Sequence, residues 1–301
     1  ESAGSFIIGL ATPVVTVTVG SYTYDGTAQG PIAATNTGTG TSYTWSYEGT
    51  GGTTYPASAT RPTDAGTYTA TATVAADGNY GVASSSATAF SITAKSLTVD
   101  VTANNKIYDG TTTASVGSAS LVGVETGDTV TIDGSPSAWD FASSAVGTSI
   151  AVTATTGTYT ITGADAGNYS LTQPSGLTAD ITRKPIEVTA DAGQTKVYGS
   201  LDPVVFTYAV TTGSLEASDN FTGSLDRAAG ESVGDYAIGQ GTLSIDNIGN
   251  YTLTFVSNDF SITAKSLTVD VTADNKVYDG TTGATVTLGT PGLVGVETGD
   301  T

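Results

Sequence analysis

The sequence contains no cysteine, no methionine and no histidine in its 301 residues. Without cysteine there is no disulfide bond, and without cysteine or histidine a Ser-His-Asp or Cys-His catalytic device is impossible. The commonest transition-metal ligands are missing for the same reason. Because the absent residues include the side chains that oxidise most easily, the composition suits a long-lived extracellular polymer.

Basic residues are scarce, with 9 Lys and Arg against 28 Asp and Glu, which gives a formal net charge of −19. A nucleic-acid-binding protein needs a clustered basic face to displace counterions from phosphates, so we expect no nucleic-acid partner. An anionic membrane surface would repel the chain. The apolar run Phe6–Ala11 is also far shorter than the ~20 residues that a membrane span requires, so we expect no membrane insertion.

Helical periodicity is missing as well, because no window of a dozen residues has apolar positions at 3.6-residue spacing. The chain is rich instead in Thr, Val and Tyr, which favour strands, and in Gly, Asn and Asp, which favour turns. Short alternating segments such as 97–101 and 68–74 are typical of strands. The sequence therefore predicts an all-β protein.

One long internal repeat organises the chain. Residues 90–112 read FSITAKSLTVDVTANNKIYDGTT and recur at 260–282, 170 residues later, with two substitutions. A Tyr-Asp-Gly or Tyr-Gly-Ser motif opens each unit and a Gly-Asn-Tyr motif comes near its end. These landmarks predict a last strand of a preceding module at 1–11, modules at 13–93, 96–182 and 185–263, and an incomplete module at 266–301. We expect such a window to belong to a longer array.

Modules of 80–90 residues with short alternating strands predict small antiparallel immunoglobulin-like β-sandwiches in tandem. The segment Asp64–Tyr68 resembles a tyrosine corner, in which a tyrosine hydroxyl bonds back to the backbone, and Tyr236 occupies the same place in the third module. A β-grasp fold is the alternative. It needs a helix across a sheet, for which Leu215–Asp219 offers the only plausible turn.

Most of the cations stand at two repeated places. We expect the junction residues Lys95, Arg183, Lys184 and Lys265 to pair with carboxylates of the next module and to fix its orientation. A second set, Lys106, Lys196 and Lys276, precedes the opening tyrosine, where the stem could cover the ring with the ammonium in water. The alternative for this set is a Lys–Asn amide crosslink, with the pairs Lys106–Asn168 and Lys196–Asn250.

No catalytic, cofactor-binding or metal-binding residue is predicted, because most acids sit in turns that explain them, as Asp25, Asp109, Asp165 and Asp279 do. Calcium at a junction remains a lesser alternative, through Glu125, Asp128 and Asp133. Aromatic residues at 43, 45, 47 and 55 favour sheet-face packing over a sugar platform, and Trp139 is expected in a core. Three N-glycosylation sequons begin at Asn168, Asn220 and Asn250.

Residues 101–112 (VTANNKIYDGTT), 121–128 (LVGVETGD) and 163–171 (GADAGNYSL) together resemble a bacterial YDG domain. Residues 196–203 (KVYGSLDP), 227–238 (RAAGESVGDYAI) and 249–253 (GNYTL) resemble the YGX-type MBG domain that alternates with it, and 13–93 is a more distant MBG-like relative. The resemblance implies repeat regions of very large, secreted bacterial surface proteins with adhesin-like roles. It carries over no catalytic or ligand residue.

These observations predict a structural repeat region of a bacterial extracellular surface protein that forms a semi-rigid stalk or fibre of an adhesin. The expected partners are neighbouring modules of the same or identical chains, with a glycan or cell-surface ligand as a further option. A self-assembling extracellular filament and a glycan- or surface-binding adhesive module remain the alternatives. No enzymatic activity is expected.

Overall fold

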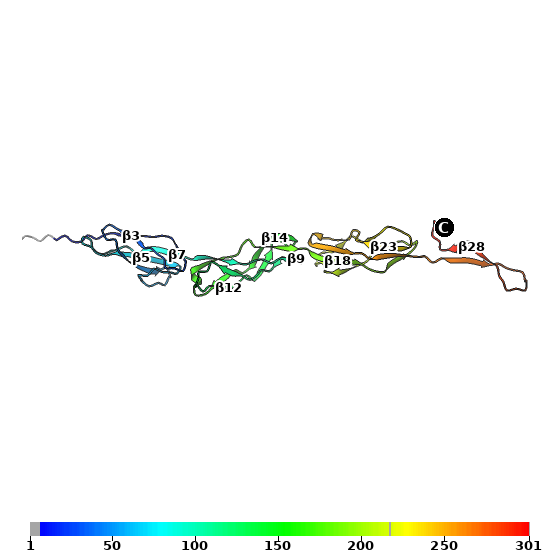
Figure 1. The fold of residues 1–301 in the computed structure, drawn as a ribbon, viewed down its shortest axis with the longest axis horizontal. Helices are drawn as coiled ribbons and strands as arrows, with labels where there is room; N and C mark the ends of the chain where they lie inside the picture. The colour runs from blue at the N-terminus through cyan, green and yellow to red at the C-terminus, as the bar shows by residue number, and fades with distance from the viewer. Residues whose placement is uncertain (1–6, 217, 301) are drawn as a thin grey trace, which may run out of the picture. The chain divides into compact units, whose positions relative to one another are not determined.

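The computed structural model describes residues 7–216 and 218–300, and its secondary structure in this range is almost entirely β (Figure 1). The helices of the described residues are two three-residue 3₁₀ turns, Ala166–Asn168 and Ile248–Asn250. No described helix is long and apolar enough to cross a membrane. Contacts divide the chain into two units. One holds residues up to Asn104, Thr112–Ala142 and Ser149–Ala179, and the other Asn105–Thr111, Ser143–Thr148 and residues from Asp180 onward.

The first unit begins with a sheet in the order β2-β7-β5-β4, in which β6 also pairs with β5. Its central strand β5 alternates, so that Tyr68, Ala70, Ala72 and Val74 point into the core while the threonines between them face outward. A second, two-stranded sheet, β1-β3, brings Val15 and Val17 against this buried face. The strands are β1 (Val15–Thr18), β2 (Tyr22–Thr23), β3 (Ala33–Asn36), β4 (Tyr43–Thr50), β5 (Gly66–Val74), β6 (Ala83–Ser84) and β7 (Thr88–Thr93).

The rest of the first unit centres on β8 (Lys95–Asp100), which pairs with β11 in antiparallel and with β16 in parallel orientation. In the parallel pair Tyr169 lies opposite Lys95 and Leu171 opposite Leu97. β13 pairs with β10 and β14, and β12 pairs with β15. These strands are β10 (Thr113–Ala114), β11 (Ser120–Val122), β12 (Thr131–Gly134), β13 (Ala138–Phe141), β14 (Gly147–Thr156), β15 (Thr160–Thr162) and β16 (Tyr169–Thr172).

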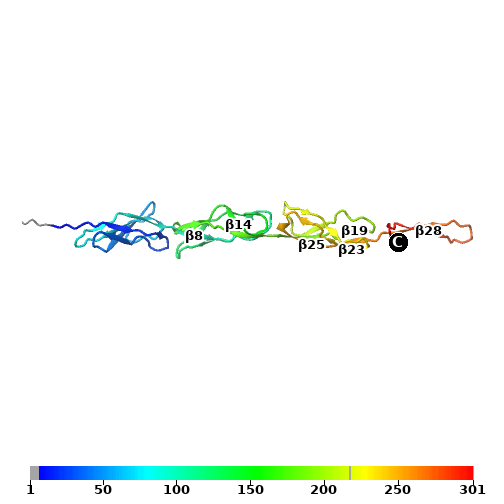
Figure 2. The ribbon, with the colours of Figure 1, turned by 90° about the horizontal axis from the view of Figure 1, so that it is seen from above.

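The second unit repeats this arrangement around β18 (Lys184–Ala190), which lies between antiparallel β20 and parallel β25 (Figure 2). A second sheet has the order β19-β26-β23-β22, while β9 pairs with β17, β21 with β24 and β27 with β28. The remaining strands are β9 (Lys106–Ile107), β17 (Thr178–Thr182), β19 (Gln194–Val197), β20 (Tyr208–Thr212), β21 (Phe221–Thr222), β22 (Asp226–Arg227), β23 (Gly234–Gly239), β24 (Ser244–Ile245), β25 (Tyr251–Val256), β26 (Asp259–Thr263), β27 (Thr268–Ala273) and β28 (Val286–Val294).

The all-β, sandwich-like prediction is confirmed, and both tyrosine corners form. The Tyr68 hydroxyl donates to the Asp64 carbonyl at 2.7 Å and the Tyr236 hydroxyl to the Ser232 carbonyl at 2.8 Å. The helix of a β-grasp fold is not found among the described residues; Leu215–Asp219 contains Ala217, which lies outside them. The parallel strand pairs were not anticipated, because sequence alternation does not report strand direction.

The module boundaries predicted from the landmarks stay a prediction. Of the range 1–11, residues 1–6 lie outside the described part of the chain, and Ala11 forms an isolated parallel bridge with Tyr80. One residue separates β7 from β8, and one residue separates β17 from β18. Successive sheets therefore follow each other without a flexible linker.

Candidate functional site at three repeated junctions

A buried aspartate joins two tyrosines that come from distant parts of the first unit. The hydroxyls of Tyr24 and Tyr169 both donate to Oδ2 of Asp128, at 2.7 Å and 2.5 Å. Their rings meet edge to face with centroids 5.3 Å apart, and both are buried in one apolar cluster with Tyr68, Phe90 and Leu97. We call this set, with Lys95 and Glu125, the first junction. It ties the Tyr24 loop to the β8 sheet.

The second unit contains the same arrangement around Asp219. The Tyr251 hydroxyl donates to Oδ2 of Asp219 at 2.6 Å and the Tyr108 hydroxyl at 3.2 Å, while the Asn247 amide donates to Oδ1 at 2.5 Å. The two rings are again edge to face, 5.4 Å apart. Asp219 is only 6% exposed. This set, with Lys184 and Glu216, is the second junction.

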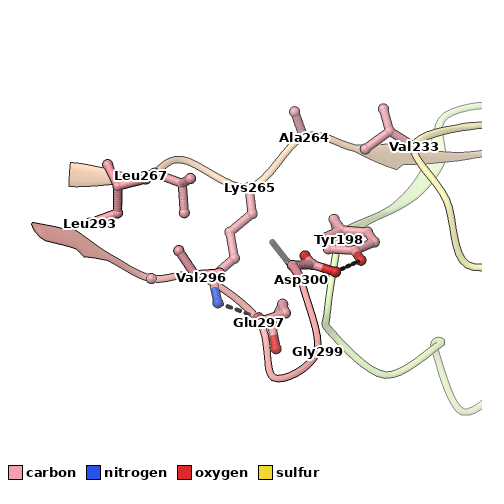
Figure 3. A pocket seen from close by; sticks show the side chains of 11 residues that line it. Tyr198, Val233, Ala264, Lys265, Leu267, Leu293, Val296, Glu297, Gly299 and Asp300 are labelled. Atoms are coloured by element: carbon pink, nitrogen blue, oxygen red, sulfur yellow. Dashed lines mark hydrogen bonds and ion pairs between the residues drawn. The ribbon is translucent and has the colours of Figure 1, made fainter. Parts of the chain in front are cut away.

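A third junction combines Tyr198, Asp300, Lys265 and Glu297 (Figure 3). The Tyr198 hydroxyl donates to Oδ1 of Asp300 at 2.9 Å, and the Lys265 ammonium pairs with the Glu297 carboxylate. In the described residues, the carboxylate of Asp300 receives one tyrosine where Asp128 and Asp219 each receive two.

The Asp and Gly of the opening motif shape the loop that presents the tyrosine. The Asp25 carboxylate accepts from both the backbone N–H and the hydroxyl of Thr27, and Asp109 and Asp279 do the same with the threonine two residues on. The motif glycine has a positive φ, +74° at both Gly26 and Gly110. It faces the glutamate of its junction, so a left-handed turn brings the loop close to that side chain.

The junction cations behave as predicted in three of four cases. Lys95 pairs with Glu125, Lys184 with Glu216 and Lys265 with Glu297, each with a glutamate of the segment that follows it. Arg183 differs, because its Nε donates to the Gly249 carbonyl at 3.2 Å. Each ion pair is partly exposed, so its contribution is of order 0.2–1 kcal/mol and mainly orients the segments.

The lysines that precede the opening tyrosine are not hydrated as predicted. Lys106 donates to the Asp109 carboxylate and the Thr111 carbonyl, both at 2.8 Å, and Lys276 repeats these bonds with Asp279 and Thr281. The Lys196 side chain is 5% exposed and pairs with two carboxylates, Asp202 and Glu231. The loop closes around these ammonium groups because it supplies a carboxylate within reach of each of them.

The proposed Lys–Asn amide crosslinks are not supported, because their asparagines have other partners. Oδ1 of Asn168 accepts from the Ala65 N–H at 2.9 Å, and Oδ1 of Asn250 accepts from the Val146 N–H at 3.0 Å. Asn168 also donates to the Asp64 carboxylate and is buried, so its sequon is occupied by the junction. The sequon at Asn220 is exposed.

The electrostatics of the tyrosine–aspartate groups favour a charged carboxylate beside neutral phenols. Hydrogen bonds from Tyr251, Asn247 and Tyr108 hold the pKa of Asp219 below its usual range. Burial, followed by the bond to Asp219, raises the pKa of Tyr251 well above that of a free phenol, and Asp128 acts similarly on the buried Tyr24. These groups are set to hold hydrogen bonds over the whole neutral range.

The other candidate sites take structural positions. Glu125 and Asp128 lie at a junction, as the calcium hypothesis requires, but they bind an ammonium and two hydroxyls. In the described residues no group of three acids converges as a cation site would need. Tyr43, Trp45 and Tyr47 share the inner face of β4, with Tyr55 partly buried beside them, and Trp139 is buried. The packing interpretation of these aromatics is thereby confirmed.

Sequence reasoning missed the acids that complete the second and third junctions, and it missed the role of the opening tyrosine. A signal was present, because Glu-x-x-Asp occurs at 125–128, 216–219 and 297–300. It also missed a buried network in which Asp202 and Glu231 bridge Lys196 and Arg227, with the guanidinium 5.4 Å from the Phe260 ring centroid.

Two family models match the chain. Residues 93–176 match the YDG domain, and residues 186–261 match the MBG domain of the YGX type. A comparison with curated proteins gave no match. The second junction therefore connects the two matched regions directly, because Tyr108 lies in the first of them and both Asp219 and Tyr251 lie in the second.

Proposed function

We propose that this chain, which carries a YDG domain followed by an MBG domain of the YGX type, is a structural repeat region of a bacterial extracellular surface protein. In this role the modules form a semi-rigid stalk that holds another part of the protein away from the cell. The YDG and MBG domains are consistent with a repeat region of the adhesin type. Its partners are neighbouring modules, and no catalysis is involved.

The repeated tyrosine–aspartate junction is the observation that carries this proposal. A tyrosine presented by one loop is buried against a carboxylate and a second tyrosine of the following sheet, once in each unit. An ion pair and a one-residue connection accompany both of these junctions. Such a contact limits bending between successive sheets, which a stalk requires and a flexible tether does not.

Small-angle X-ray scattering of the full chain tests the stalk. A compact protein of this length has a radius of gyration of about 19 Å, so a stalk should give a clearly larger value that does not change with concentration. The double variant Tyr24→Phe/Tyr108→Phe should broaden the distance distribution. The matched variant Tyr208→Phe, whose ring packs against Phe221, should not. A radius near 19 Å would refute the proposal.

The same measurement addresses the alternatives. Growth of the particle with concentration would favour a self-assembling filament over a stalk. Binding to a glycan array by the isolated chain would favour an adhesive module. The burial of Tyr47 and Trp139, and the packing of Trp45 against the core, leave few aromatic faces for stacking on sugars, which supports the stalk over direct glycan binding.

A further inference from the structure

The third junction has a hollow where the first two junctions hold a second tyrosine. The hollow has a volume of about 580 Å³, and Tyr198, Val233, Leu267, Leu293, Glu297 and Asp300 line it (Figure 3). Asp300 already receives the Tyr198 hydroxyl on one side. Lys265 and Glu297 form the same ion pair as Lys95 and Glu125 of the first junction. The site is therefore built to the same plan, with one position open in the described residues.

Exposure at matched positions identifies what the hollow lacks. Leu97 is 0% exposed and Val99 6% exposed, whereas the residues 170 positions later, Leu267 and Val269, are 48% and 59% exposed. In the first unit the cover comes from β16, which runs parallel to β8 with Tyr169 opposite Lys95. In the described residues β27 pairs with β28 on one side, so its other edge is open to a strand.

The two complete junctions show what such a strand must carry. Each has a Gly-Asn-Tyr-x-Leu sequence, at 167–171 and at 249–253. The tyrosine donates to the junction aspartate, and the leucine two residues on packs against Leu97 in the first unit. The asparagine accepts the N–H of the residue before a strand-entry glycine, Ala65 in one case and Val146 in the other. Val233 precedes Gly234 in the same way and is 57% exposed.

We propose that this hollow is a binding site for an extended Gly-Asn-Tyr-x-Leu strand of a separate polypeptide, added in parallel to β27. The incoming tyrosine donates to Asp300, the asparagine accepts the Val233 N–H, and the leucine covers Leu267 and Leu293. The backbone of the strand pairs with the open edge, which is the usual mode of strand addition. The occupant is specified by continuity with the two junctions already filled in this chain.

Strand capture goes beyond the role of a stalk and fails independently of it. A peptide of residues 167–173, GNYSLTQ, should bind the full chain with one-to-one stoichiometry by isothermal titration calorimetry. Hydrogen-exchange mass spectrometry should then show new protection at 266–273 and 293–300. Replacing the peptide tyrosine with phenylalanine should weaken binding about tenfold or more, because a hydrogen bond to a carboxylate is lost.

Variants of the chain separate this site from the other two. Asp300→Asn should weaken peptide binding to the same degree, while Asp133→Asn, at an exposed acid on β12, should leave it unchanged. The proposal is overturned if the peptide does not bind at millimolar concentration or if the phenylalanine peptide binds equally well. It is also overturned if protection appears at 95–100 or 184–190, because that would mean exchange into a filled junction.

Discussion

Replacement of Asp219 by asparagine is the sharpest test of the junctions, because one carboxylate accepts from three donors. Those donors are the hydroxyls of Tyr251 and Tyr108 and the amide of Asn247, at 2.6, 3.2 and 2.5 Å. The asparagine keeps the shape and one acceptor oxygen, but it removes the charge and turns an N–H₂ group toward buried donors. Hydrogen bonds to a charged group contribute about 1.5–3 kcal/mol each, so we expect a loss of about 2–4 kcal/mol.

Hydrogen-exchange mass spectrometry on the full chain is the appropriate assay, because an array of modules does not unfold in a single two-state step. The loss should appear in peptides that cover 208–222 and 247–256. Asp259→Asn is the matched control, since this exposed acid lies in the same unit on β26, and it should change local stability by less than about 0.5 kcal/mol.

A double-mutant cycle isolates the contact between the loop and the following sheet. Tyr108→Phe combined with Asp219→Asn should show a coupling of about 1 kcal/mol. The mixed pair of Tyr24→Phe with Asp219→Asn should be additive, because Tyr24 donates to Asp128. A coupling within about 0.3 kcal/mol of zero for Tyr108 and Asp219 would refute the view that this bond ties the two segments together.

Three further predictions concern pH, the corner and the turn. The lowered pKa of Asp219 gives stability that is present above its ordinary pKa near 3.8 and lost as pH falls through the lowered value. The raised pKa of Tyr251 gives stability that is present below pH 10.0 and lost as pH rises through the raised value, so thermal unfolding by circular dichroism should be flat between these limits. Tyr236→Phe should destabilise the β23 sheet by about 1 kcal/mol in the same exchange assay, since the corner bond is lost. Gly110→Ala should cost about 1–2 kcal/mol in urea unfolding because φ is +74°, whereas Gly249→Ala, with no atom near the added Cβ, should cost less.

Those parts of the structure that depend on neighbouring residues could be predicted from the sequence. Alternation gave the inward residues of β5, and the Asp-x-Gly-x-Tyr spacing gave the corner at Tyr68, because a hydroxyl four residues along reaches back to the carbonyl. The junction lysines were predictable because they recur at a fixed place beside acids. Local chemistry determines each of these features.

The junction itself could not be derived in this way, because its members come from segments that lie about 100 residues apart. Tyr24 meets Asp128 across 104 residues and Tyr108 meets Asp219 across 111 residues. Spacing along one strand or turn does not report such a contact. Only the joint recurrence of the opening tyrosine, Glu-x-x-Asp and Gly-Asn-Tyr could have indicated it, since three motifs that repeat together can share one site.

The two versions of the opening loop reach the same result by different chemistry. In Tyr108-Asp109-Gly110 the aspartate closes the turn onto Thr111 and also neutralises Lys106. In Tyr198-Gly199-Ser200 that aspartate is absent, and the Ser200 N–H closes the turn onto the Val197 carbonyl at 2.9 Å. Lys196 must then find its counter-charge elsewhere, which explains why Asp202 and Glu231 converge on it. In both loops a glycine with positive φ faces the junction glutamate and the tyrosine reaches the junction aspartate. The invariant element is therefore the tyrosine–aspartate bond, and the residues after the tyrosine are alternative ways to present it.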